Sequence, residues 1–469
     1  MITPPQSTKA VPVGRRRIWL SALVAGSIAL ALAACTSPPS PSGGSVQPPS
    51  PSGGSVQSMA PIVFAPGLGM SALNVTVDTT DATTSFTFLV PAMNPVEVLP
   101  EGASSALDYS VSSGLPRSAA DQVPRWLSLV IDGRGAAENQ PGVSVTPVSV
   151  GEDFSAECPR YLALADQLEQ AGWTVDADVY CLPFDYRYAP GDNSFVTDFT
   201  DLVERAVAQA DGTKAVIACH SQGCLMAYHA LRVVDPAWVE SHIAFLYGFA
   251  GQFSGCSDCL RWAFQEGWSW DTGNENASPV DPTWVGEMGL GLQSSVYGDA
   301  VLFTNGDREY RAADAADLLD DAGAVAMGRA AARYSLDDQD WFRQGSVAHE
   351  QLPIPSRFVF GIDLPTTVGY AFDDVDERTG TCDEPECTGF WNSTSPAPIE
   401  ADGDGGDSSW MNRAPEAWTP DPSCDIRTLP GVNHMDIVTN AEAVSGLIVA
   451  ARASVGGVVP CAPTTGQAR

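Results

Sequence analysis

The stretch that decides the fold is Ala215-Val-Ile-Ala-Cys-His-Ser-Gln-Gly-Cys-Leu-Met-Ala-Tyr-His229. The short apolar run from Ala215 to Ala218 predicts a buried strand. His220-Ser-Gln-Gly223 interrupts this run, and the helix-forming residues after it predict a helix. A strand, a sharp turn and a helix in this order are typical of a nucleophile elbow, which presents a serine hydroxyl at a helix N-terminus. Ser221 is therefore the candidate nucleophile.

The elbow motif departs from the usual Gly-x-Ser-x-Gly pattern at one position. Cys219 stands where that pattern has its first glycine. The position must be small because the strand and helix backbones cross closely there, and cysteine is only slightly larger than alanine. The alternative interpretation is structural, since most serines in such a tetrapeptide simply cap a helix.

The N-terminus predicts export. Arg15-Arg-Arg17 precede an apolar run from Ile18 to Ala34, which ends in Leu-Ala-Ala before Cys35. A basic start, a short apolar run and small residues are typical of a signal peptide, here residues 1–34. Cys35 after Leu-Ala-Ala resembles a bacterial lipobox, in which this cysteine is lipidated. The alternative is a transmembrane anchor.

A tether follows the predicted lipidation site. The ten residues Pro38–Gln47 are repeated unchanged as Pro48–Gln57. Sequence this rich in Pro, Ser and Gly cannot bury a core, so residues 35–58 are predicted to stay solvated. We therefore expect a domain exported and lipid-anchored to the outer face of the bacterial cell membrane.

The net negative charge of the chain disfavours negatively charged partners. The chain has 469 residues, a formal net charge of −33 at pH 7 and only two lysines. Such a chain is repelled by nucleic acid and by anionic lipid headgroups. No nucleic-acid partner is expected, and the lipid anchor must hold the chain at a membrane surface.

Residues 59–469 are predicted to form one α/β domain. Apolar runs such as 61–66, 243–247 and 358–361 alternate with helical patterns such as 199–210 and 440–452. Alternating strands and helices predict a mostly parallel central sheet with helices on both faces. With the elbow, this pattern predicts an α/β-hydrolase fold. An insertion is expected around residues 80–140, and a lid around 251–300.

The lid segment carries a cluster of aromatic residues, Trp262, Phe264, Trp268 and Trp270. These side chains either insert into a lipid interface or form an ordinary aromatic core. The sequence leaves both interpretations open.

Cysteine usage agrees with export. Of 11 cysteines, ten remain besides Cys35, and an even number in an exported chain favours disulfides. Short loops favour the pairs Cys256–Cys259 and Cys382–Cys387. Zinc is the alternative at the first pair, but no second Cys-x-x-Cys or histidine pair stands at ligand spacing. Cys219 and Cys224, which flank Ser221, pair either with each other or elsewhere.

The catalytic base is sought among five histidines. An α/β-hydrolase needs an acid and then a histidine after the serine. His434 lies between a predicted strand and the last helix, where this fold places its histidine. Asp404, in Asp402-Gly-Asp-Gly-Gly-Asp407, is the predicted acid, and Asp407 is the alternative. A calcium loop is disfavoured, because Gly406 and Arg413 occupy positions that need an oxygen ligand.

Several blocks resemble the lecithin:cholesterol acyltransferase and lysosomal phospholipase A2 family, in the family's order. They are Ala65–Asp78, Pro141-Gly-Val143, Leu182-Pro-Phe-Asp-Tyr-Arg187, Gly361-Ile-Asp-Leu-Pro-Thr366, Gly403-Asp-Gly405 and Leu429-Pro-Gly-Val-Asn-His434. Two departures from the family matter: Cys219 replaces glycine, and Gly406-Asp407 stand where the family has Thr-Val.

The resemblance implies a catalytic triad of Ser221, Asp404 and His434. It also implies that the backbone N–H of Leu68 joins that of Gln222 in the oxyanion hole. The expected function is a serine lipid acyl hydrolase or O-acyltransferase on phospholipid or acylglycerol esters, without metal or organic cofactor. The alternatives are an esterase for small or cell-wall esters and a non-catalytic surface lipoprotein of the same fold.

Overall fold

The computed structural model describes residues 59–89, 123–257, 259–264, 283–288, 292–335, 352–373, 378–379, 390–391, 396–417, 419 and 421–456. These residues belong to one unit, Gln57–Arg469. The predicted signal peptide, Cys35 and most of the tether lie outside the described residues. No helix within the described part of the chain is long and apolar enough to cross a bilayer.

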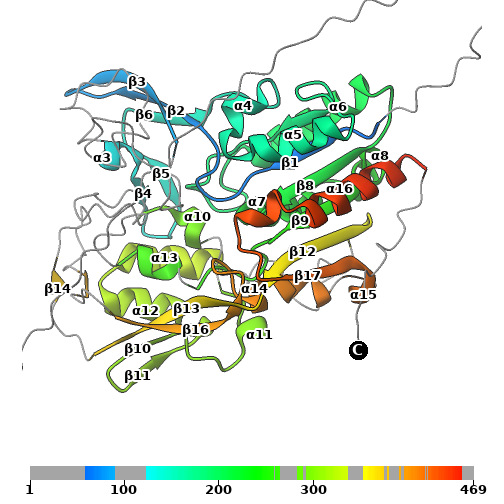
Figure 1. Ribbon diagram of the computed structural model, residues 1–469. Coiled ribbons are helices and arrows are strands. Elements are labelled where there is room, and N and C mark those ends of the chain that lie inside the picture. The colour runs from blue at the N-terminus through cyan, green and yellow to red at the C-terminus, as the bar shows by residue number, and fades with distance from the viewer. Residues whose placement is uncertain are drawn as a thin grey trace, which may run out of the picture. The chain divides into compact units, whose positions relative to one another are not determined.

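A six-stranded parallel sheet forms the centre of the unit (Figure 1). Five of its strands are nearly continuous runs of buried residues, as expected for parallel strands covered on both faces, whereas the edge strand Ile426–Pro430 is only partly buried. In sheet order they are β17 (Ile426–Pro430), β12 (Ser356–Ile362), β9 (Ile243–Phe249), β8 (Ala215–His220), β1 (Ile62–Ala65) and β7 (Val179–Cys181).

Helices cover both faces of this sheet. Alternate residues of β1 enter different cores: Ile62 and Phe64 join one apolar cluster, and Val63 and Ala65 join the other. One cluster includes residues of α5 (Leu162–Gln170) and α16 (Ala441–Ser454). The other includes residues of α6 (Phe195–Gln209), α7 (Gln222–Val233) and α8 (Pro236–His242). The predicted α/β-hydrolase fold is confirmed.

Smaller antiparallel sheets extend the unit. One has the order β3 (Thr83–Phe88), β2 (Leu73–Asp78) and β6 (Val143–Pro147), and another pairs β4 (Leu129–Ile131) with β5 (Ala137–Asn139) after α3 (Val123–Leu127). Part of the predicted insertion around 80–140 therefore forms strands, and residues 90–122 lie outside the described residues.

A four-stranded sheet is formed by segments that follow α8 in the chain, and its last strand ends just before Asp404. Its order is β11 (Arg308–Tyr310), β10 (Phe303–Asn305), β13 (Leu364–Phe372) and β16 (Ala397–Gly403). The remaining elements are α4 (Phe154–Glu157), α9 (Cys259–Trp262), α10 (Val285–Met288), α11 (Ser294–Tyr297), α12 (Ala315–Ala322), α13 (Val325–Tyr334), β14 (Arg378–Thr379), β15 (Phe390–Trp391), α14 (Ser409–Arg413) and α15 (Pro422–Asp425).

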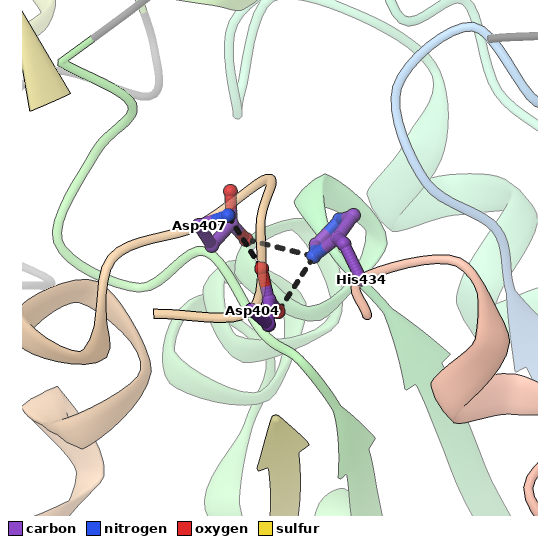
Figure 2. A group of neighbouring side chains, drawn as sticks. All are labelled: Asp404, Asp407 and His434. Atoms are coloured by element: carbon purple, nitrogen blue, oxygen red, sulfur yellow. Dashed lines mark hydrogen bonds and ion pairs between the residues drawn. The ribbon is translucent and has the colours of Figure 1, made fainter. Parts of the chain in front are cut away.

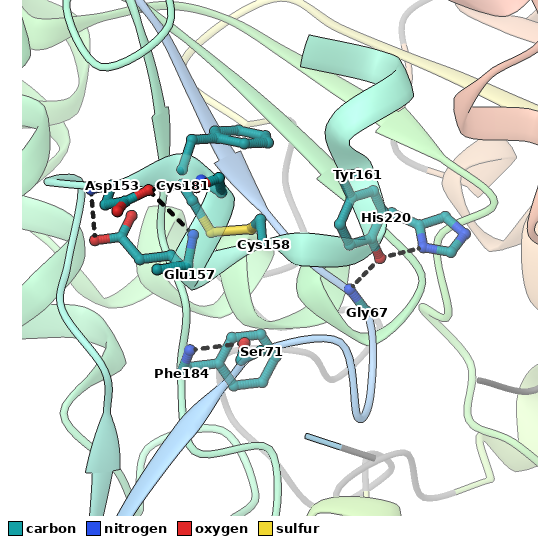
Figure 3. Close-up of a disulfide and its surroundings, with 12 residues drawn as sticks. Gly67, Ser71, Asp153, Glu157, Cys158, Tyr161, Cys181, Phe184 and His220 are labelled. Carbon is teal, nitrogen blue, oxygen red and sulfur yellow. Dashed lines mark hydrogen bonds between the residues drawn. A yellow bond between two sulfur atoms is a disulfide. The ribbon is translucent and has the colours of Figure 1, made fainter. Parts of the chain in front are cut away.

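Two disulfides lie outside the elbow and link segments of this fold. Cys256 and Cys259 are bonded, which confirms that predicted pair over the zinc alternative. Cys158 and Cys181 are also bonded, and join the end of α4 to the end of β7 (Figure 3). The predicted pair of Cys382 and Cys387 lies outside the described residues.

Candidate active site

Ser221 lies at the turn between β8 and α7. Its backbone has φ 54° and ψ −130°, a conformation that costs a non-glycine residue roughly 1–3 kcal/mol. Gly223 permits the turn, because a Cβ there would lie 2.2 Å from the carbonyl oxygen of Pro66 and 2.5 Å from that of Ala65. The strand–turn–helix geometry expected from the sequence is therefore present, with Ser221 at its apex.

A disulfide encloses the elbow. Cys219, at the end of β8, is bonded to Cys224 in the first turn of α7, with 4.8 Å between their Cα atoms. Both side chains are fully buried. The departure from glycine at Cys219 therefore adds a covalent link between the two elements that hold Ser221.

The turn after β1 and the first residue of α7 both lie beside the nucleophile. A Cβ on Gly67, in the turn after β1, would lie 3.4 Å from Ser221 Oγ, and Leu68 is the next residue. Gln222 is the first residue of α7. Neither N–H donates a hydrogen bond to another described residue. The oxyanion-hole role that the resemblance implies for Leu68 and Gln222 stays a prediction.

His434 lies in the loop between β17 and α16 and contacts two aspartates (Figure 2). Its Nδ1 is 3.0 Å from Asp404 Oδ2 and 3.3 Å from Asp407 Oδ2. The N–H of His434 also donates to the carbonyl oxygen of Asp404 at 3.0 Å. Gly406 lets the ring approach, because a Cβ there would lie 2.8 Å from the Cβ of His434.

Burial and charge set the ionisation of this cluster. Burial lowers the pKa of His434, but the nearby carboxylates of Asp407 and Asp404 outweigh it and raise that pKa to about 9. Burial also raises the pKa of Asp407 to about 7, with His434 opposing the shift and Asp404 adding to it. A positively charged imidazole is therefore strongly stabilised at this position.

Gln252 connects the serine to the acidic loop, and no sequence motif marks this residue. Its backbone N–H donates to the carbonyl oxygen of Ser221 at 3.2 Å, and its Nε2 donates to Asp407 Oδ1 at 2.7 Å. The hydroxyl of Ser221 makes no hydrogen bond to His434 within the described residues. Such contacts often tighten only when substrate binds.

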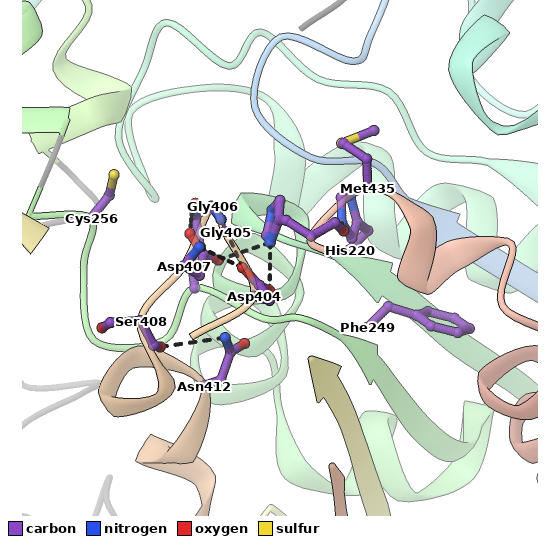
Figure 4. A network of polar contacts seen from close by, with 12 residues as sticks. His220, Phe249, Cys256, Asp404, Gly405, Gly406, Asp407, Ser408, Asn412 and Met435 are labelled. Atoms are coloured by element: carbon purple, nitrogen blue, oxygen red, sulfur yellow. Dashed lines mark hydrogen bonds and ion pairs between the residues drawn. The ribbon is translucent and has the colours of Figure 1, made fainter. Parts of the chain in front are cut away.

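His220 and Tyr161 join three active-site loops (Figures 3 and 4). The hydroxyl of Tyr161 accepts the N–H of Gly67 at 2.9 Å and lies 2.9 Å from His220 Nδ1, while His220 Nε2 lies 3.0 Å from the carbonyl oxygen of His434. Since a carbonyl only accepts, we assign the proton of His220 to Nε2. The sequence excluded His220 as a base but gave no sign of this bridge.

Burial holds the pKa of His220 well below its usual range, and the charge of neighbouring His434 lowers it further. The contact with the carbonyl of His434 opposes the shift. A neutral imidazole fits the hydrogen bonds assigned above.

Part of the predicted lid packs beside the elbow. The side-chain amide of Gln222 donates to the carbonyl oxygens of Tyr186 at 3.4 Å and Gly286, in α10, at 3.2 Å. Phe264 is buried against Phe303, Phe372 and Trp391, so it belongs to an aromatic core. Trp268 and Trp270 lie outside the described residues.

The acid–histidine cluster also has the residue types of a metal site. Potential ligand atoms of Asp404, Asp407 and His434 all lie within 4.8 Å of one another. The hydrogen bond of Asp404 to Nδ1 already accounts for the orientation of this histidine. The catalytic steps proposed below therefore use only the side chains and backbone of the protein.

Sequence comparison supports the resemblance implied by these motifs. The family model for lecithin:cholesterol acyltransferase matches residues 115–272, which include the elbow. A lecithin-cholesterol acyltransferase-like 1 protein of Oryza sativa subsp. japonica is 23% identical over 323 residues, covering 64% of this chain and 65% of the rice protein.

The chain is similar to the lecithin:cholesterol acyltransferase family over these residues. The human lysosomal phospholipase A and acyltransferase is 24% identical over 145 residues, covering 31% of this chain and 33% of the human protein. The aligned regions therefore span less than two thirds of each relative's length.

Solved structures show weaker overall likeness. A chain of the Tle4–Tli4 complex has a TM-score of 0.46 and 13% identity, covering 86% of this chain and 99% of that chain. An α/β hydrolase fold protein from Nakamurella multipartita has a TM-score of 0.26 and 12% identity, covering 62% of this chain and 88% of that chain.

Proposed function

We propose that this chain is a serine-dependent lipid acyl hydrolase or O-acyltransferase that acts on phospholipid or acylglycerol esters. The observation that carries the proposal is the strained elbow conformation of Ser221, in a fold that also seats His434 against an acid. The relationship to acyltransferases and phospholipases supports a lipid ester as the substrate.

The first half-reaction acylates the serine. Ser221 Oγ attacks the ester carbonyl carbon while His434 Nε2 takes the hydroxyl proton. Asp404 holds Nδ1–H and stabilises the imidazolium. The oxyanion forms beside the N–H groups of Leu68 and Gln222, and His434 then returns the proton to the leaving alcohol.

The second half-reaction releases the acyl group. His434 Nε2 removes a proton from water or from an acceptor alcohol, whose oxygen attacks the acyl-enzyme carbonyl. Collapse restores the hydroxyl of Ser221 and gives a fatty acid or a new acyl ester. No step requires a metal or organic cofactor.

The decisive experiment compares the purified chain with its Ser221→Ala variant. Both are treated with a fluorophosphonate probe and then with mixed phospholipid, acylglycerol and a lipophilic alcohol, with products identified by mass spectrometry. We expect serine-dependent labelling together with fatty acid, lysolipid or new ester. Labelling without lipid products would favour a small or cell-wall ester, and absence of labelling would favour a non-catalytic lipoprotein.

We also propose that Cys35 is lipidated and anchors the exported chain to the outer face of the bacterial membrane. The lipobox-like residues before Cys35 and the repeated tether after it support this proposal. Cys35→Ser is expected to release the chain from the membrane fraction. Retention of that variant in membranes would instead favour a transmembrane anchor.

A further inference from the structure

Two carboxylates face one nitrogen of the candidate base, where the orientation of a histidine requires only one. Asp404 Oδ2 lies 3.0 Å and Asp407 Oδ2 3.3 Å from His434 Nδ1 (Figure 2). A single N–H proton therefore meets two acceptors on the same side of the ring.

Both carboxylate oxygens of Asp404 accept hydrogen bonds, from its own loop and from His434. Its Oδ1 accepts the N–H of Gly406 at 3.0 Å and the N–H of Asp407 at 2.6 Å, and its Oδ2 accepts Nδ1–H. Three donors thus contact this carboxyl group, which is fully buried. Asp404 is thus a complete orienting acid on its own.

The two carboxyl oxygens of Asp407 (Figure 4) have different partners, and one of them contacts only His434 among the described residues. Its Oδ1 accepts Gln252 Nε2 at 2.7 Å. Its Oδ2 is buried and accepts no hydrogen bond from the described residues, so its close contact is with His434 Nδ1. The residue as a whole is 1% exposed. A buried carboxylate oxygen in this position is satisfied only by the charge on the imidazole.

The titratable groups around Asp407 come from four elements. Asp404 belongs to its own loop, His434 to the loop after β17 and Tyr297 to α11, while His220 at the end of β8 contacts the far side of the His434 ring. His220 and Tyr297 are neutral, because burial lowers the pKa of the first and raises that of the second. The charge on His434 is therefore set by the two aspartates.

We propose that Asp407, held in place by Gln252, is a second positioning acid of His434. Asp407 orients the imidazole ring and sets the pH at which the ring becomes a free base. The effect on acylation rests on the proposed function, whereas the contact between Asp407 and His434 does not. During acylation one proton moves from Ser221 Oγ to His434 Nε2, and none moves to Asp407. The carboxylate of Asp407 stabilises the imidazolium that results.

The sign of the effect follows from the charge. A nearby carboxylate favours protonated His434, whose pKa is raised to about 9. Removing the charge of Asp407 lowers that pKa, so the free base forms at lower pH. The titrations of Asp407 and His434 are coupled in the wild type. In the Asp407 variants residue 407 no longer titrates, so the titration of His434 is observed without it.

The test measures the His434 titration directly, by NMR of the full chain labelled with ¹⁵N-histidine. The chain has five histidines, and His434→Gln assigns the signal. Asp407→Asn and Asp407→Val are expected to lower the pKa of His434 by about one unit. Asparagine keeps the shape of aspartate without its charge, and valine removes both oxygens. Asp402→Asn, which removes an exposed carboxylate two residues before Asp404, is expected to leave the pKa unchanged.

A variant at a second residue and a kinetic measurement separate the proposed role from a general loss of folding. Gln252→Leu removes the hydrogen bond to Asp407 and is expected to lower the pKa of His434 by a smaller amount. The pH at half-maximal fluorophosphonate labelling should move in parallel with the NMR pKa in all three variants. Unchanged pKa values of His434 in folded Asp407 variants would overturn the proposal, even if labelling fell. A chain that is never labelled would refute the proposed function, while the NMR result would still decide the role of Asp407.

Discussion

Gly223→Ala tests whether the close crossing of β1 and α7 positions the nucleophile. A Cβ at this position would lie 2.2 Å from the carbonyl oxygen of Pro66 and 2.5 Å from that of Ala65. Both obstacles are backbone atoms at the end of β1, so no side-chain rotation relieves the contact. Real Cβ atoms essentially never approach within 3.0 Å, so either α7 or the β1 turn must move by at least about 0.8 Å.

That displacement has two expected costs. Overpacking a tightly packed interior typically destabilises a protein by about 1–3 kcal/mol. A shift of about 1 Å in a catalytic group can also slow its reaction by roughly 100-fold. Because the β1 turn carries Gly67 and Leu68 beside Ser221, we expect the loss in labelling rate to exceed what partial unfolding explains.

The assay measures urea unfolding and the rate of fluorophosphonate labelling for the wild type, Gly223→Ala and Gly133→Ala. Gly133 is the matched control, because it is exposed and a Cβ there would meet no atom within 4 Å. The control should change the free energy of unfolding by less than about 0.5 kcal/mol. Wild-type stability and labelling in Gly223→Ala would refute the packing argument.

Two further predictions concern stability. Replacing Cys158 and Cys181, which are 23 residues apart, by alanine should cost about 3 kcal/mol in urea unfolding. The same change at Cys219 and Cys224, 5 residues apart, should cost about 2 kcal/mol because the loop is shorter, and the reverse order would contradict this reasoning. Burial lowers the pKa of His229 to about 4, so the unfolded chain binds the extra proton and stability is lost as pH falls from 6.5 towards 4. His229→Gln should remove about 3 kcal/mol of that loss, measured by unfolding at pH 7 and pH 4, and an unchanged pH dependence would exclude this role.

Much of the scaffold could be predicted because its signals are local. The β-branched run before Ser221 and the helix formers after it are contiguous, so the elbow is readable from some 15 residues. The parallel sheet follows from alternating apolar and helical patterns in the same way. The disulfide of Cys256 and Cys259 was accessible for a related reason, since a three-residue separation keeps two cysteines near each other in most conformations.

The sequence by itself determined the elbow, the order of serine, acid and histidine, and the α/β fold, because short-range backbone preferences and the apolar pattern encode them. Tertiary structure alone decided that two aspartates share the Nδ1 of His434, and that Gln252 joins Asp407 to the serine. It alone placed His220 between Tyr161 and the loop of His434. The two contacts of His220 join residues 59 and 214 positions apart. Chain folding in three dimensions, rather than any local preference, fixes which of several similar side chains meet.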